Sequence, residues 1–134
     1  MLIRNPSAYH GNNNKRPFFE GWYHKLTTKN NRSLAIIPGI YHSGETKEKT
    51  AFVMVFEGAN GNVYFKRYET TEFHCSKSEY KLHLGPNYFS LNEIRLDISD
   101  GDFELTGQVF ANNIKPWPVT LLEPGCMGWY AYIP

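Results

Sequence analysis

The chain is 134 residues long and carries 14 Lys and Arg against 13 Asp and Glu, a formal net charge of +1. This length predicts one domain that buries its own core, and the balanced charge argues against nucleic acid as a partner. No segment is apolar enough for a signal peptide or a membrane span. We therefore expect a cytoplasmic protein without an integral membrane segment.

The first predicted strand is "FFEGWYHKL", residues 18–26, which follows a polar stretch. We expect residues 1–15 to form an N-terminal arm and residues 16–134 to form one β domain. Strand alternation places every second side chain of the first strand on one face, namely Phe18, Glu20, Trp22, His24 and Leu26. The opposite face carries Phe19, Gly21, Tyr23 and Lys25.

Two hairpins are predicted after the next strand, "SLAIIPGIY" at residues 33–41. Asn60-Gly61 is a strong hairpin signal, and as a two-residue loop it places Phe56 opposite Phe65. One face of this hairpin is apolar and aromatic, so we expect it to face the core.

The second hairpin is centred on Asp100-Gly101, which as a loop places Ile98 opposite Phe103. Its other face carries Asp97 and Glu104, so this hairpin should have a wet side and a buried side. Between the two hairpins, "SEYKLHLG" at residues 78–85 alternates apolar and polar positions as a strand does.

These strands predict an all-β antiparallel meander that curls into a partial or complete lipocalin-like barrel. Nine Phe, nine Tyr and three Trp either fill the core or line a cavity for an apolar ligand, and both interpretations stay open. The expected core comprises Trp22, Ile36, Phe52, Met54, Phe56, Phe65, Leu82, Leu96, Ile98, Phe103 and Leu105. Cys75 and Cys126 are expected to be free thiols.

Three ordered segments resemble the tocopherol cyclase-like family: "RPFFEGWYHKL" from Arg16, "LAIIPGI" from Leu34 and "PGCMGWYAYIP" from Pro124. The resemblance covers the chain from about Arg16 onward. It implies a lipocalin-like β architecture, shared with carotenoid-hydratase-like relatives, and the cyclisation of a prenylated hydroquinone to a chromanol. In that family the second G-W-Y segment opens another half. The resemblance therefore implies that this chain corresponds to the first half, with the second half missing.

Closing a chroman ring needs an acid that protonates an alkene, aromatic faces that stabilise a cation, and a dry cavity. Glu20 is the candidate catalytic acid, and its other interpretation is a structural hydrogen-bond acceptor. The candidate substrate-binding residues are Trp22, Tyr23, His42, Trp129 and Tyr130. This chemistry needs no cofactor, and the spacing of the five histidines predicts no metal site.

Three functions remain open at this point. The first is a tocopherol cyclase-like enzyme, and the second is a lipocalin-like protein that binds an apolar small molecule without catalysis. The third is an inactive fragment. If Gly128-Trp129-Tyr130 opens a second unit, the last strand is an unpaired aromatic edge, so we also expect self-association through it and weak catalysis.

Overall fold

The computed structural model describes residues 7–11, 17–46 and 48–117, and these residues form two antiparallel sheets with almost no helix. The first sheet, sheet A, contains β1 (Phe18–Gly21), β2 (His24–Thr27), β3 (Ser33–His42), β4 (Lys49–Glu57) and β5 (Val63–Tyr68). A short 3₁₀ helix, η1 (Thr70–Glu72), leads to the second sheet. Sheet B contains β6 (Phe73–Cys75), β7 (Lys81–Leu84), β8 (Asn87–Ser90), β9 (Glu93–Asp100) and β10 (Phe103–Phe110).

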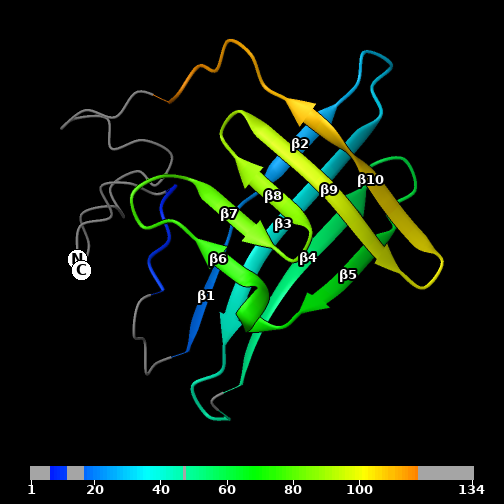
Figure 1. Cartoon of the computed structure of the whole chain (residues 1–134). Helices are drawn as coiled ribbons and strands as arrows, with labels where there is room; N and C mark the ends of the chain where they lie inside the picture. The colour runs from blue at the N-terminus through cyan, green and yellow to red at the C-terminus, as the bar shows by residue number, and fades with distance from the viewer. Residues whose placement is uncertain (1–6, 12–16, 47, 118–134) are drawn as a thin grey trace.

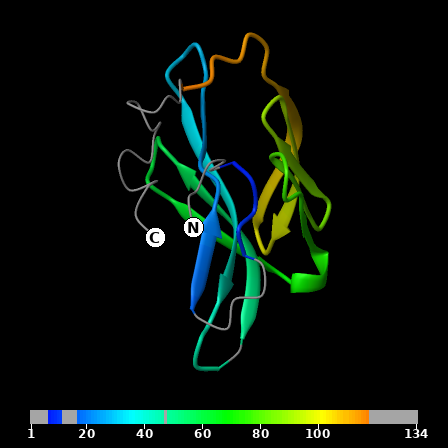
Figure 2. The same cartoon turned by 90° about the vertical axis from the view of Figure 1, so that its left-hand side faces the viewer.

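The two sheets lie face to face, and the strands of one cross those of the other (Figure 1, Figure 2). Sheet B pairs in chain order from β6 to β10, and in sheet A β3, β4 and β5 pair in chain order while β1 and β2 both pair with β3. The prediction of an all-β antiparallel fold is therefore confirmed. Over the described residues the two sheets do not close into a complete barrel, so the partial form of the predicted architecture is the one observed.

The strand predicted for residues 18–26 is interrupted once, between Gly21 at the end of β1 and His24 at the start of β2. β1 pairs with the end of β3 and β2 pairs with its start, so both lie along the same edge of β3. At the interruption the backbone N–H of Trp22 donates to the carbonyl of Pro38 at 3.0 Å. The predicted alternation is confirmed through the break, because the even-numbered residues from Phe18 to Leu26 are more buried than the odd-numbered ones.

The core lies between the two sheets. Trp22, Ile36, Leu82, Leu96 and Ile98 belong to it, as predicted. The predicted core residues Phe103 and Leu105 are partly buried and pack against it.

The prediction for β4 and β5 was wrong about which face meets the core. Ala51, Val53 and Val55 face the interior, whereas Met54, Phe56 and Phe65, which were predicted for the core, lie outside the core cluster. Phe52 is buried as predicted, but it also lies outside the cluster between the sheets. Both faces of β4 are apolar, so alternation alone could not choose between them.

Outside sheet A, three aromatic rings form a stack that we call the outer stack: Phe19, Phe52 and Phe65. The ring of Phe52 lies 5.9 Å from that of Phe19 and 5.2 Å from that of Phe65, centroid to centroid. Phe52 is only 3% exposed because it is covered by these neighbours, while Phe65 is 43% exposed. A Cβ on Gly39 would lie 2.6 Å from the Phe52 ring, so this glycine lets the ring approach the backbone.

Both predicted hairpins exist, and in both the register differs from the prediction by two residues. Phe56 pairs with Val63 rather than Phe65, because the connection spans residues 58–62 instead of Asn60-Gly61 alone. The Asn60 side chain stabilises this longer loop by donating to Glu57 Oε2 at 2.6 Å and accepting from the N–H of Asn62 at 3.0 Å.

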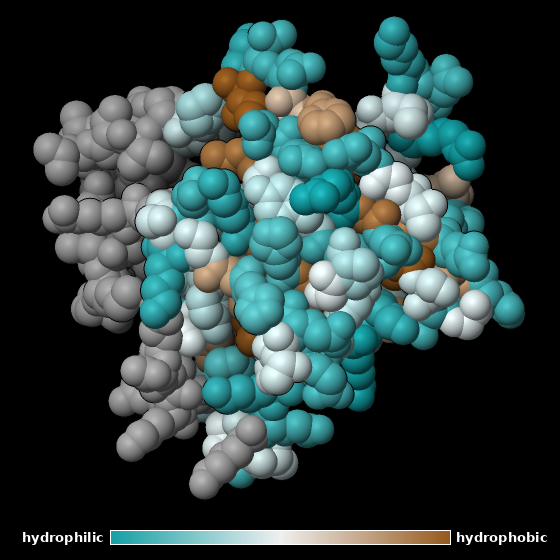
Figure 3. Space-filling view, viewed as in Figure 1, coloured by the Kyte–Doolittle hydropathy of each residue, from teal (hydrophilic) through white to brown (hydrophobic). Residues whose placement is uncertain are grey.

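In the second hairpin, Leu105 pairs with Ile98, since the loop is Gly101-Asp102. A two-residue register difference keeps each side chain on its predicted face. Asp97 and Glu104 accordingly lie on the exposed face of sheet B, which is mostly hydrophilic (Figure 3).

Candidate functional site

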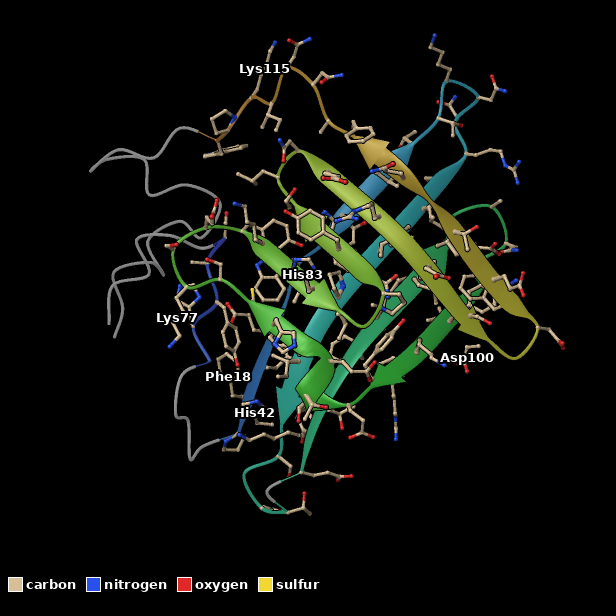
Figure 4. The ribbon with its side chains drawn as sticks, in the orientation of Figure 1. Phe18, His42, Lys77, His83, Asp100 and Lys115 are labelled. Atoms are coloured by element: carbon tan, nitrogen blue, oxygen red, sulfur yellow. The ribbon has the colours of Figure 1, made fainter. Side chains whose placement is uncertain are left out.

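One end of the sandwich gathers the polar side chains of the interior. Strand pairing sets Phe18, His42 and Lys49 side by side across β1, β3 and β4. The next row inward holds Glu20 and Ile40. Phe18 and His42 lie next to each other in Figure 4, with their ring centroids 5.6 Å apart.

Glu20 is held by a histidine from the N-terminal arm. The backbone N–H of His10 donates to Glu20 Oε2 at 2.9 Å, and His10 Nδ1 lies 2.8 Å from Glu20 Oε1. The Glu20 side chain is 14% exposed, and each of its two oxygens contacts a nitrogen of His10.

The arm makes two further contacts with the body of the protein. Trp22 Nε1 donates to the carbonyl of Ser7 at 3.1 Å, and the N–H of Tyr9 donates to the carbonyl of Ser76 at 3.3 Å. The Tyr9 ring also packs edge-on against Phe73. Residues 7–11 thus connect the first strand of sheet A to the β6–β7 connection of sheet B.

A cavity of about 720 Å³, which we call the end cavity, opens at this end of the sandwich. Its volume lies in the range of small-molecule sites. Apolar and aromatic groups come from the arm and both sheets, and polar groups come mainly from β3, β4 and the β6–β7 region. The lining residues are Tyr9, Gly11, Ile40, His42, Lys49, Thr70, Phe73, His74, Cys75, Ser76, Lys77, Lys81 and His83.

His42 is the buried polar side chain of this cavity, and it is 6% exposed. Its Nδ1 is the one buried side-chain nitrogen or oxygen among the described residues that has no hydrogen-bond partner. Leaving a buried polar group unpaired costs about 1–3 kcal/mol. Burial lowers the pKa of His42, and the charge of Lys49 lowers it further, so the neutral imidazole is favoured.

Glu20 does not line the end cavity, but its charge acts on two residues that do. Burial raises the pKa of the Cys75 thiol to about 12, and the negative charge of Glu20 adds to this effect. Burial also raises the pKa of Tyr9, again with a contribution from Glu20. Cys75 is a free thiol, and this environment keeps it protonated and unreactive as a nucleophile.

A second polar pair lies deeper, beside Trp22. His24 Nε2 and the Tyr80 hydroxyl are 2.5 Å apart, and the His24 ring stacks between Tyr80 and Phe89. Burial lowers the pKa of His24 to about 4 and raises that of Tyr80. A shallower pocket of about 330 Å³ next to this pair is lined in part by Trp22, Tyr23 and His24.

The structure brings two of the predicted site residues, Glu20 and His42, to the same end of the sandwich. Trp22 is a core residue that packs against Phe73 and Tyr80, whereas Tyr23 is exposed. The candidates Trp129 and Tyr130, the second G-W-Y segment and Cys126 lie outside the described residues.

Sequence analysis missed His10, Tyr9 and Lys49. His10 and Tyr9 precede a polar run that carries no strand or helix pattern, so nothing local indicated that they pack on β1. Lys49 reaches the site through its pairing with His42 across β3 and β4, a register that the sequence pattern did not predict.

The described residues hold no group of three or more His, Cys, Asp or Glu side chains arranged to bind a metal. Over those residues, no helix has the length and apolar character required to cross a bilayer.

Comparison of the chain with protein-family models, with curated proteins and with solved structures found no match.

Proposed function

We propose that the chain binds an apolar, ring-bearing small molecule in the end cavity, and that a prenylated aromatic is the class of ligand, as the resemblance to the tocopherol cyclase-like family implies. The observation that carries the proposal is a cavity of about 720 Å³ whose lining includes His42, a buried histidine with an unpaired Nδ1. Rings from Tyr9 and Phe73 and the side chain of Ile40 supply apolar surface for such a ligand.

The cavity lining offers a direct test of binding. Thr70 lines the cavity and Thr71, its neighbour in η1, does not. Thr70→Trp should occupy part of the cavity and weaken binding of a geranyl-substituted hydroquinone by about tenfold or more, which is about 1.4 kcal/mol. Thr71→Trp should leave the affinity within about twofold of the wild-type value.

Isothermal titration calorimetry on the full chain measures these affinities. Equal effects of Thr70→Trp and Thr71→Trp would mean that the ligand binds elsewhere. A wild-type protein that does not bind the hydroquinone would exclude this ligand class.

Ring closure catalysed by Glu20 is a second candidate, favoured by the position of this carboxyl one row behind His42 on the interior face. Binding without catalysis ranks above it because Glu20 does not line the end cavity and both of its oxygens contact His10, so this carboxyl is not placed to reach a bound ligand. Catalysis would require His10 to release Glu20 when the substrate enters.

Two matched variants separate the roles of Glu20. Under the catalytic proposal, Glu20→Gln lowers chromanol formation by about 100-fold or more, whereas His10→Ala, which breaks the same pair but keeps the carboxyl, retains or increases it. Under the binding proposal the wild type, Glu20→Gln and His10→Ala all fail to form chromanol. Equal loss of activity in both variants would assign the pair a structural role only.

A further inference from the structure

The charged residues that line the end cavity are all cationic. Among the described residues, three lysines and no acidic side chain line it: Lys49, Lys77 and Lys81. The Lys81 ammonium is already paired with Glu79 at 2.8 Å. Figure 4 shows Lys77 on the same side of the molecule as Phe18 and His42, well away from Asp100 and Lys115.

The cation nearest to the buried part of the cavity is Lys49. It pairs with His42 across β3 and β4, and its charge lowers the pKa of that histidine. No described acidic side chain forms an ion pair with Lys49. Glu20, which lies one row inward of His42 on β1, is in contact with His10 instead. A positive charge and an unpaired imidazole therefore lie side by side at the cavity wall.

We propose, building on the proposed function, that the ligand is an aromatic acid whose carboxylate binds between Lys49 and His42. One carboxylate oxygen accepts from the Lys49 ammonium, and the other accepts from the imidazole N–H of His42. The apolar body of the ligand then lies against Tyr9, Ile40 and Phe73. The nitrogen that the protein leaves unpaired, His42 Nδ1, has almost no accessible surface, so the imidazole has to turn about its Cβ–Cγ bond to offer this nitrogen to the ligand.

A carboxylate fits this pair better than a neutral head group or a phosphate. One unpaired lysine beside the buried histidine balances a single negative charge, and two donors match two carboxylate oxygens. A phosphate group would bring a third oxygen and more negative charge than the pair of Lys49 and His42 balances. A neutral amide or hydroxyl could accept a hydrogen bond from Lys49 but would not balance its charge.

The test compares two probes of the same shape, 2-naphthoate and its neutral isostere 2-naphthamide, by isothermal titration calorimetry on the full chain. The wild-type protein should bind naphthoate about tenfold more tightly than naphthamide. Thr70→Trp should weaken both probes, because it fills the cavity that both occupy.

Lys49→Met and His42→Phe should each reduce the preference for naphthoate to about threefold or less, while naphthamide binding changes little. Lys25→Met is the matched control, since Lys25 is an exposed lysine on β2 that does not line the cavity. This control removes the same charge and should keep the full preference for naphthoate. Lys49 is exposed, so its substitution should not impair folding.

Each outcome decides the proposal. Loss of the preference in Lys49→Met and His42→Phe but not in Lys25→Met supports it. A wild-type protein that binds both probes equally overturns it and leaves the proposed function standing, as does an equal loss in all three variants. If neither probe binds, or if Thr70→Trp affects neither, the inference fails, and the titration with the geranyl-substituted hydroquinone decides the proposed function separately.

Discussion

The buried pair of His24 and Tyr80 should make the stability of the protein fall in mild acid. Its two polar atoms are 2.5 Å apart, and the imidazole stacks at 5.5 Å from the Tyr80 ring and 5.6 Å from the Phe89 ring, centroid to centroid. The perturbations are Tyr80→Phe, His24→Phe and the double variant, each of which keeps a six-membered or five-membered ring in the stack.

Each single variant leaves one buried polar group without its partner. Tyr80→Phe leaves His24 Nε2 unpaired, and His24→Phe leaves the Tyr80 hydroxyl unpaired, so each should lower the free energy of unfolding by about 1–3 kcal/mol. The double variant removes both polar groups and should cost less than the sum of the two single variants. The difference measures the coupling between the two side chains.

The pH dependence follows from the pKa of His24, which burial lowers to about 4 from an ordinary value of 6.5. Between these two values the unfolded chain binds more protons than the folded chain. The stability contribution is therefore intact above pH 6.5 and is lost as the pH falls toward 4. From pH 7.5 to pH 4.5 the loss should be about 2–3 kcal/mol.

Urea titrations of the four proteins at pH 7.5 and pH 4.5 measure both effects. The free energy of unfolding should fall between pH 7.5 and pH 4.5 in the wild type and in Tyr80→Phe. In His24→Phe and the double variant this fall should be smaller by about 2–3 kcal/mol. His83→Phe is the control, because His83 is exposed and its removal should leave the pH dependence unchanged. If His24→Phe loses as much stability in acid as the wild type does, the histidine is not the group that titrates, and the reasoning is refuted.

Two further predictions test the packing of sheet A through changes in the free energy of unfolding. Gly39→Ala should destabilise the protein by about 1–3 kcal/mol, because a Cβ there would lie 2.6 Å from the Phe52 ring, whereas Gly21→Ala, at the paired position in β1, meets nothing closer than 3.4 Å and should be tolerated. Val53→Thr should cost about 1–3 kcal/mol, since it buries a hydroxyl between the sheets, while Met54→Thr on the outer face should cost less. Equal costs for both Thr variants would mean that β4 has no distinct inner face.

The first strand shows how much of this fold is local in origin. Its alternation continues correctly from Phe18 to Leu26, and Trp22 is buried as expected, because the strand period of two fixes which side chains share a face. The second hairpin also has its predicted faces. Its loop begins one residue later than expected, which moves the pairing by two residues and preserves every side-chain direction.

Two features were decided only by the tertiary structure. One is which of the two apolar faces of β4 meets the other sheet, and the other is which residues meet at the end cavity. β4 is apolar on both sides, so the choice of Val53 over Phe52 for the core depends on its pairing with β3 and on the space between the sheets. The contact of His10 with Glu20 joins residues ten positions apart and the pairing of Lys49 with His42 joins residues 49 − 42 = 7 positions apart, but both need the chain to fold back at a place that no alternation marks. Glu20 and His42 could be selected from their local context, but their partners are set by sheet register and by the path of the arm, and neither leaves a periodic signal in the chain.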